Sequence, residues 1–549
     1  MMVVFLSFVS LALGNESNDE SSWSLMFSED FEARYIVSND LLEGFEERES
    51  LLNYIEQVNR FGVLASSGAY EIGVQVDQVS LFANRYFMNE ELVYENEIVG
   101  DNLTSFAPDH YVNIDKVWVT RRSGGSTLQF GDHYASFGRG LALNMVKQTG
   151  IDIDTSILGV KTTTRLGDWS VESTIGVTNI QQISQDNRIN LLSPDTRHWI
   201  VGGRVDAPSI AGANLGLHGV GYQFTSSTAD IEPFGTPSEG LDAAVLGATC
   251  EVYGLGGWDI YMEGDLFSYL SDDLVVDEES QGLGLYASAS KYIGNLTVTL
   301  EGKHYLNTER LNTYAGVDNY EFASGPTLEY ERVITEDSAA AVNSNDITGG
   351  RLRLDLMAGV ATPHLEVSVS RDRDLEGLHF NESSETIIHP VAGVDFFSSH
   401  VQAIANAGYR VDIRDSHGSD SLIHGDISLD VPVGPWEGEF ALDVKAFSWG
   451  ENSLQQTDFI EESFSLGLGV SDDITLVVYQ DYTDNELISS TGNVTDRVYG
   501  AGEIQWHTGT SSTLKAFYGA YKAGIRCAGG QCRSLPGFEG ARVSYSSVF

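Results

Sequence analysis

Connections that are alternately short and long join the segments of this chain that have the pattern of β-strands. The short connections are tight turns at residues 123–125, 167–168, 254–257, 294–295, 361–363, 434–435 and 472–473. The long connections lie at residues 84–110, 181–196, 227–242, 310–345, 485–495 and 524–539. A closed up-and-down barrel in an outer membrane has this asymmetry, because its periplasmic turns are short and its extracellular loops are long. The rhythm therefore predicts an all-β, transmembrane, antiparallel up-and-down barrel of about 22–24 strands.

Side chains within these segments alternate between apolar and polar, which is the two-residue period of a strand. Over residues 351–360, Leu352, Leu354 and Leu356 share one face, and Arg351 and Arg353 lie on the other. A soluble β-sandwich shows the same alternation, because its apolar faces meet in a core. A sandwich has no reason to place every short turn at one end, so we favour the membrane barrel. The pattern is weakest in the first two strands, where residues 51–60 fit a short helix equally well.

The first 14 residues have the pattern of a secretory signal peptide, with an apolar run and a small-x-small cleavage site at Ala12-Leu13-Gly14. No lysine or arginine precedes the apolar run. A polar segment follows at residues 15–22, and no linker divides residues 23–549. No later segment is apolar for long enough to be a membrane-spanning helix. We therefore expect one barrel domain in the outer membrane of a Gram-negative bacterium, with the membrane lipids as its partners.

The last strand places Val543, Tyr545 and Phe549 at alternate positions, so that it ends in an aromatic residue. Strands of outer-membrane barrels carry aromatic residues at the membrane interfaces. We interpret this pattern as the assembly signal that the barrel-assembly machinery reads.

The net charge of −48 makes nucleic acid a poor partner, because phosphate binding needs clustered lysine and arginine. Acidic residues gather in three presumed loops, at residues 272–279, 329–337 and 372–385. The simplest interpretation is that they keep the loops solvated. The alternative is that divalent cations bridge these acidic loops to anionic lipid headgroups, or that a charged mouth enriches cations. None of the clusters has the spacing of an EF-hand, so the sequence predicts no dedicated metal site and no cofactor.

Two of the three cysteines, Cys527 and Cys532, flank Ala-Gly-Gly-Gln in the last long loop. In an oxidising compartment this spacing favours a small disulfide ring. A metal site needs more ligands than this loop offers. The third cysteine, Cys250, is in phase with the apolar residues of its strand and is interpreted as a small apolar side chain.

A glycine-rich stretch runs from Phe130 to Leu143. Arg139 stands between two glycines and is long enough to reach a carboxylate such as Asp132, which would fix a loop folded inside the pore. The plainer interpretation is a glycine-rich exit from a strand into a loop. The glycine spacing lacks the strand–helix context of dinucleotide binding. The candidate lumen or constriction residues are Asp132, Tyr134, Phe137, Gly138, Arg139 and Gly140.

Signs of catalysis are weak. Neither His-Glu-x-x-His nor Gly-x-Ser-x-Gly occurs in the chain. Two histidines and two acids, His417, His424, Asp415 and Asp420, fall around one presumed loop, where solvated polar residues are the commoner explanation. We therefore assign no catalytic residue and expect the protein not to be an enzyme.

The stretch Gly131-Asp132-His133-Tyr134-Ala135-Ser136-Phe137-Gly138-Arg139-Gly140 resembles a GD-x-Y-x-x-FGRG element of a family of outer-membrane proteins of Gram-negative bacteria, known only as a domain of unknown function. Residues 524–540 also resemble the C-terminal part of the sequences of that family. The resemblance implies a large barrel, either a channel or a transport-associated protein, with no assigned substrate.

Together these observations favour a porin-like channel or transport-associated barrel that passes an unknown solute. Its lumen would be gated by residues 135–152 folded inward. The alternatives are a surface binding or adhesion barrel with a closed lumen, and, less favoured, a hydrolase at the rim of the barrel.

Overall fold

The computed structural model describes residues 23–38, 54–82, 110–148, 153–180, 183–184, 191–192, 198–223, 242–270, 281–306, 308, 347–372, 385–414, 418–448, 458–484, 498–522, 524–528, 531–535 and 538–549. The predicted signal peptide, the polar segment after it and most of the three acidic clusters lie outside these residues. Within them, no helix has the length and apolar character needed to cross a membrane.

Most of the described residues belong to strands of one sheet, which we call the wall strands. They are β1 (Ser24–Ser38), β2 (Tyr54–Ser67), β3 (Tyr70–Phe82), β4 (His110–Ser123), β5 (Ser126–His133), β9 (Ile153–Leu166), β10 (Trp169–Ile180), β13 (Trp199–Asp206), β14 (Ala213–Gln223), β15 (Asp242–Leu255), β16 (Trp258–Leu270), β17 (Gln281–Ile293), β18 (Leu296–Leu306), β19 (Ile347–Leu356), β20 (Ala361–Asp372), β21 (Glu385–Phe397), β22 (Gln402–Arg414), β23 (Gly418–Val433), β24 (Trp436–Ser448), β25 (Phe459–Ser471), β26 (Ile474–Thr483), β27 (Val498–Gly509), β28 (Ser512–Tyr521) and β31 (Phe538–Val548).

Among the described residues, seven short strands lie outside the wall. They are β6 (Ala135–Phe137), β7 (Leu143–Met145), β8 (Lys147–Gln148), β11 (Ile183–Ser184), β12 (Leu191–Leu192), β29 (Gly524–Ala528) and β30 (Gln531–Leu535).

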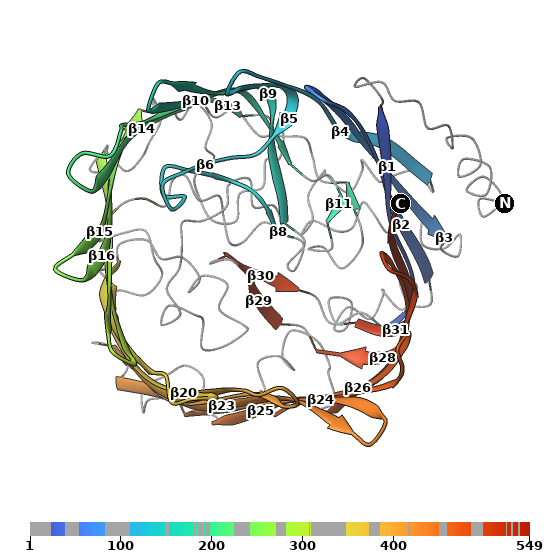
Figure 1. Cartoon of the computed structure of the whole chain (residues 1–549). Coiled ribbons are helices and arrows are strands. Elements are labelled where there is room, and N and C mark those ends of the chain that lie inside the picture. Colours follow the sequence, from blue (N-terminus) through green and yellow to red (C-terminus); the bar gives the residue numbers. More distant parts are fainter. Residues whose placement is uncertain are drawn as a thin grey trace.

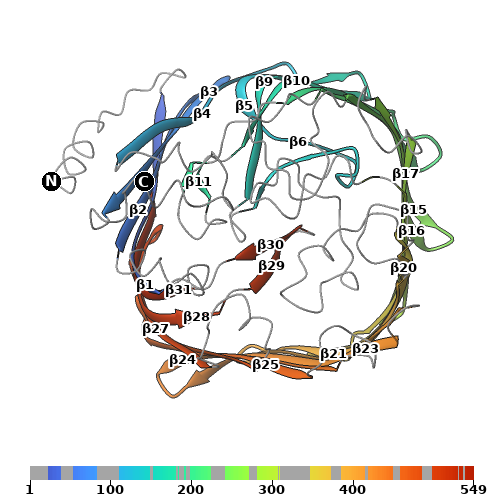
Figure 2. The same ribbon diagram turned by 180° about the vertical axis from the view of Figure 1, so that it is seen from behind.

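The wall strands form one closed ring (Figures 1 and 2). The sheet holds 25 strands; without β8, which pairs only with β9, a ring of 24 antiparallel strands remains. The ring closes because β1 pairs with β2 on one side and with β31 on the other. The predicted barrel class is thereby confirmed, with a strand number inside the expected range. Residues 54–60 belong to the strand β2, so the alternative of a helix there is wrong.

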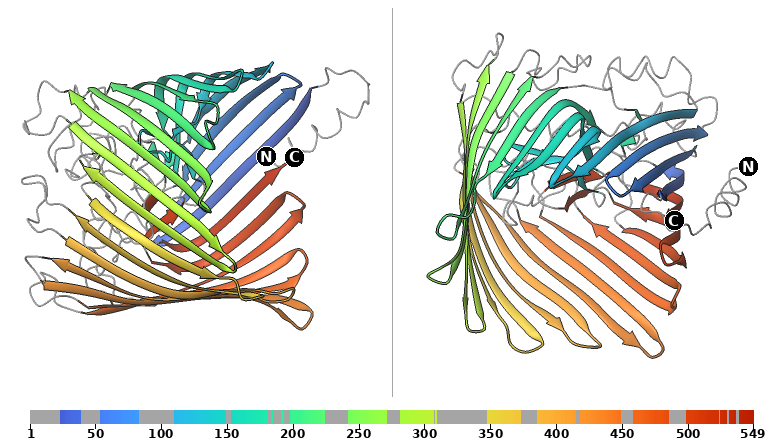
Figure 3. Two further views of the ribbon diagram at one scale, coloured as in Figure 1. Left: turned by 60° about the vertical axis from the view of Figure 1, so that its left-hand side comes forward. Right: turned by 45° about the horizontal axis from the view of Figure 1, so that its top comes forward.

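Tight turns join β2 to β3, β4 to β5, β9 to β10 and further pairs up to β27 and β28. Since successive wall strands are antiparallel, these turns all lie at one end of the barrel, where Figure 3 shows short hairpins. One predicted turn is misplaced: residues 361–363 begin β20, and the turn occupies residues 357–360. Ala358 and Ala361 pair across this turn.

The outer surface of the barrel is apolar. In β20, Leu365, Val367 and Val369 are 48%, 38% and 46% exposed, whereas Glu366 and Ser368 between them are buried. The apolar side chains therefore point away from the lumen, and the polar ones point into it. This is the arrangement of a membrane barrel and the reverse of a soluble one, which buries its apolar face.

Exposed aromatic side chains form two girdles around this surface. The girdle near the tight turns contains Trp23, Tyr70, Trp169, Trp436, Trp506 and Phe549. Nearer the other end lie Tyr35, Trp199, Tyr409 and Tyr518. Two such girdles mark the interfaces of a membrane, where an aromatic ring has one apolar side and one wet side.

Three pairs of short strands lie within the outline of the ring in both axial views (Figures 1 and 2). They are the hairpin of β6 and β7, the pair β11 and β12, and the pair β29 and β30. The first hairpin leaves the wall after β5 and returns to it through β8 and β9, and it carries the glycine-rich sequence.

Candidate functional site

The glycine-rich segment folds into the lumen as the hairpin of β6 and β7, which we call the inward hairpin (residues 134–148). Its turn is tight because Gly138 and Gly140 have φ angles of +60° and +94°, in the region that favours glycine. The backbone N–H of Gly140 donates a hydrogen bond of 3.0 Å to the carbonyl of Phe137, which closes the turn. The plainer interpretation, a simple exit from a strand, is thus incomplete, since the segment leaves the wall and turns inward.

An apolar cluster holds the inward hairpin against the wall. Phe137 and Met145 are fully buried, and the Tyr222 hydroxyl donates a hydrogen bond to the carbonyl of Ala142. The alternate residues of the same wall strands, such as Trp199 and Val201, are exposed on the outer surface. The lumen side of β13 to β16 is therefore apolar where the hairpin covers it. The cluster consists of Ala135, Phe137, Ala142, Leu143, Met145, Ile157, Ile200, Val220, Tyr222, Ala243, Val245, Phe267 and Tyr269.

The tip of the hairpin is held by polar contacts to β16 and β17. The backbone N–H of Arg139 donates a hydrogen bond of 2.8 Å to Glu263, whose carboxylate also accepts one of 2.5 Å from Tyr261. The Arg139 guanidinium lies 4.5 Å from the ring centroid of Tyr286 and 5.7 Å from that of Tyr261. A Cβ atom at Gly138 would lie 2.0 Å from a Glu263 oxygen, so only glycine allows the carboxylate to approach this closely.

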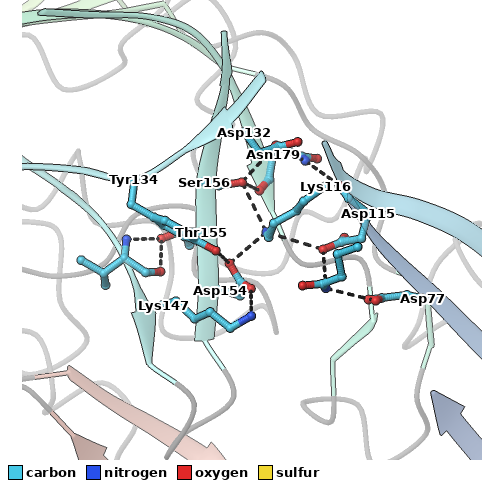
Figure 4. Close-up of polar contacts among 12 residues, drawn as sticks. Asp77, Asp115, Lys116, Asp132, Tyr134, Lys147, Asp154, Thr155, Ser156 and Asn179 are labelled. Atoms are coloured by element: carbon cyan, nitrogen blue, oxygen red, sulfur yellow. Dashed lines mark hydrogen bonds and ion pairs between the residues drawn. The ribbon is translucent and has the colours of Figure 1, made fainter. Parts of the chain in front are cut away.

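The base of the hairpin is fixed by one shared carboxylate (Figure 4). Asp154 of β9 lies 2.9 Å from the ammonium of Lys116 on β4 and 2.9 Å from that of Lys147 on β8. The Tyr134 hydroxyl donates a third contact, 2.7 Å long, to the same carboxylate. Asp154 therefore ties both ends of the inward segment to the wall. Three donors around one buried acid satisfy the rule that a buried charge must be paired.

Asp132 has a different partner from the one that the sequence suggested. Its carboxylate accepts hydrogen bonds of 2.7 Å from the backbone N–H of Val117 and 2.7 Å from the side chain of Asn179. Arg139, at the far tip of the hairpin, contacts β16 and β17 instead. The expected Arg139–Asp132 pair is thus wrong, because Asp132 stays on the wall strand β5 while the turn carries Arg139 across the lumen.

A β-bulge in β4 brings an extra acid into this network. Gln75 pairs with Lys116 and Val76 pairs with Ile114, so Asp115 has no opposite residue. Asp115 and Lys116 are consequently both buried on the lumen side, although they are adjacent in sequence. The Asp115 carboxylate accepts a 3.0 Å hydrogen bond from the side chain of Gln75.

Alternating charges continue along the wall beyond the hairpin tip. The Tyr286 hydroxyl donates to Glu301 at 2.5 Å, and Arg351 donates to the same carboxylate at 2.5 Å. Arg351 and Arg353 both contact Glu366, at 3.2 and 3.6 Å. This row gives the lumen a charged strip across β17 to β20.

Other predicted residues lie away from the hairpin. Cys527 and Cys532 are directly opposite each other in the pair β29 and β30. Their disulfide stays a prediction. Val543 and Phe549 are exposed on the outer surface, where Phe549 stacks on Phe27 with 6.0 Å between ring centroids. Their role in assembly also stays a prediction, as does that of Tyr545.

The predicted cluster of two histidines and two acids does not surround a long loop. Only residues 415–417 separate β22 from β23, and they lie outside the described residues. Asp420 and His424 belong to β23, where the Nε2 atom of His424 lies 2.7 Å from that of His389 on β21.

Four residues that hold the hairpin were not identified from the sequence, namely Lys116, Asp154, Glu263 and Tyr222. A signal for the docking site was present, because Ala243 to Leu246 in β15 are apolar at four successive positions. Such a run means that both faces of the strand are covered, one by lipid and the other by protein. The partners of each hairpin residue come from wall strands distant in sequence, so the motif itself gave no indication of them.

No protein-family model and no curated protein sequence matches the chain. The proposed family resemblance therefore stays a prediction. Among solved structures, OccK1 (OpdK) of Pseudomonas aeruginosa is 12% identical, with a TM-score of 0.37, over 74% of this chain and 96% of that one. The translocation pore of the P pilus usher PapC is 8% identical, with a TM-score of 0.40, over 95% and 99%. The ferric enterobactin receptor PfeA of P. aeruginosa, in a mutant form, is 9% identical, with a TM-score of 0.45, over 96% and 80%.

Proposed function

We propose that the protein is a porin-like transport barrel of the outer membrane of a Gram-negative bacterium, and that the inward hairpin narrows its lumen. The observation that carries this proposal is the double attachment of the hairpin. An apolar cluster and a buried, shared carboxylate hold it inside the ring. A loop fixed in this way has a permanent position in the path of a solute.

The outer surface supports the membrane location. Exposed leucines, valines and isoleucines cover it between the two aromatic girdles. Such a surface is stable only where hydrocarbon covers it, and a closed ring leaves no unpaired strand edge in the hydrocarbon. Outer-membrane lipids are therefore the expected partners of this surface. The barrel-assembly machinery is the expected partner of β31 during insertion.

The width of the ring supports passage rather than closure by side chains alone. Eight-stranded barrels are filled by their own side chains, whereas barrels of 16 or more strands enclose a channel or a plugged lumen. The inward hairpin covers the lumen side of β13 to β16 and reaches β17 at its tip. The charged strip on β17 to β20 lines the lumen beside the hairpin with polar groups, which suit a hydrophilic solute.

The experiment is a planar-bilayer recording of the wild-type barrel and of a variant that lacks residues 137–140. We expect the deletion to raise the single-channel conductance, because it removes the tip of the hairpin. A deletion of the same length in the tight turn at residues 254–257 serves as the control. Unchanged conductance in the hairpin variant would argue against a constriction. The absence of solute flux in liposome swelling would favour the adhesion alternative.

A further inference from the structure

Three buried side chains, His218 on β14 and Glu263 and Asp265 on β16, lie at the tip of the inward hairpin. They are 2%, 3% and 0% exposed. One ligand atom of each lies within 4.8 Å of one ligand atom of each of the others. Glu263 contacts the hairpin directly through the backbone N–H of Arg139. We call these three residues the buried triad.

Each member of the triad has one polar atom held by the protein and one without a partner. His218 Nε2 is hydrogen-bonded to Asp265 Oδ1 at 2.6 Å, and Glu263 Oε2 accepts from Arg139 and Tyr261. In the described part of the chain, His218 Nδ1, Glu263 Oε1 and Asp265 Oδ2 are buried and have no hydrogen-bond partner. Native proteins leave very few buried polar atoms without a partner, so three in one cluster indicate a missing ligand.

The negative charge of the triad also favours binding of a cation. Two carboxylates face one imidazole, and no lysine or arginine among the described residues forms an ion pair with Glu263 or Asp265. Buried charges are normally paired or coordinate a metal. The glycines beside the triad leave room for its side chains, because a Cβ atom at Gly247 would lie 2.0 Å from Asp265 Oδ1 and 2.3 Å from His218 Nε2.

We propose that the buried triad binds one divalent transition-metal ion, with Zn²⁺ as the best match, and that this ion fixes the tip of the inward hairpin. One imidazole and two carboxylates are a ligand set that suits Zn²⁺, whereas Ca²⁺ and Mg²⁺ prefer oxygen ligands alone. Two ligand atoms bound to one tetrahedral Zn²⁺ at about 2.1 Å are about 3.4 Å apart, so the separations within the triad, which are at most 4.8 Å, have to shorten by at most about 1.4 Å. The bound ion holds the Glu263 carboxylate in place, and Glu263 in turn holds the Arg139 amide.

The test uses the full barrel, folded in detergent, stripped with a chelator and then dialysed against Zn²⁺ alone. Elemental analysis should find about one equivalent of zinc in the wild type. His218→Ala and Asp265→Asn should each weaken zinc binding at least about tenfold, since even outer-shell partners of a metal contribute that much. Glu366→Gln and His364→Ala are matched controls with a buried carboxylate and a buried imidazole outside the triad, and they should bind zinc as the wild type does.

A second measurement uses only the wild-type protein, so it does not depend on whether the variants fold. Co²⁺ added to the stripped wild type should give a visible absorption band that Zn²⁺ abolishes. The proposal is overturned if the wild type retains no zinc, if the two triad variants retain as much as the controls, or if Ca²⁺ binds more tightly than Zn²⁺. These results are independent of the pore proposal, because zinc content is measured without any recording of conductance.

Discussion

Lys116 and Asp154 form an ion pair inside the barrel, with 2.9 Å between Nζ and Oδ1 and with side chains that are 3% and 5% exposed. Lys116 belongs to the wall strand β4, and Asp154 begins the return of the chain from the inward hairpin. The same carboxylate binds Lys147, which lies on the hairpin side. A single acid therefore fixes the base of the hairpin to the wall.

Asp154→Asn should lower the free energy of unfolding by about 3–5 kcal/mol, because it leaves the buried Lys116 without its main counter-charge. Unfolding in urea, followed by tryptophan fluorescence, measures the change. The control is Glu172→Gln, which removes a partner of Lys161 in a more exposed pair of the same 2.9 Å length. We expect a loss of at most about 1 kcal/mol there. Equal losses in the two variants would contradict the role assigned to Asp154.

Phe137→Ala should release the inward hairpin, because it removes a fully buried ring from the apolar cluster at a cost of about 3–5 kcal/mol. Hydrogen–deuterium exchange of residues 134–146 should become faster by about a hundredfold or more, as local opening becomes easier by that free energy. Phe130→Ala removes a ring of the same size that is 51% exposed, and it should leave this exchange unchanged. Protection that survives Phe137→Ala would show that the cluster does not hold the hairpin.

Gly138→Ala should disturb the hairpin tip more than the same change disturbs an ordinary turn. Its Cβ would meet the Glu263 carboxylate at 2.0 Å, and its φ of +60° is unfavourable for alanine. Gly167 has a similar φ of +64° with nothing within 4 Å, so Gly167→Ala measures the backbone strain alone, about 1–2 kcal/mol. We expect only Gly138→Ala to change the single-channel conductance. A conductance change in both variants would point to a general defect of the barrel.

The cysteines of β29 and β30 should form a disulfide in the exported protein. Directly opposed residues of an antiparallel pair have Cα atoms about 4.5–5.5 Å apart, which is within the range of a disulfide. Alkylation without reduction should therefore modify only Cys250, and alkylation after reduction should modify all three cysteines. Mass spectrometry distinguishes these results. Three modified cysteines without reduction would exclude the bridge.

The barrel was predictable from the sequence because its signal is local. The side chains of a wall strand alternate between a lipid face and a lumen face, as Leu352 and Arg351 do. Most tight turns are marked by glycine or by polar residues in the sequence itself. The position of the hairpin was not predictable in the same way. Asp132 and Arg139 are close in sequence, and only the ring determines that one stays on the wall and the other reaches β17. The apolar lumen side of β13 to β16 was visible in the sequence but had no interpretation until the hairpin covered it.

The bulge in β4 means that Asp115 is a one-residue insertion in an otherwise alternating strand. Ile114 and Val117 both face outward, and the two residues between them both face inward. Without Asp115 the strand would alternate regularly, with Lys116 still inward and Val117 still in contact with lipid. The gain or loss of one codon is therefore enough to add or remove this acid during evolution, and the membrane-facing surface of the barrel is the same in both cases.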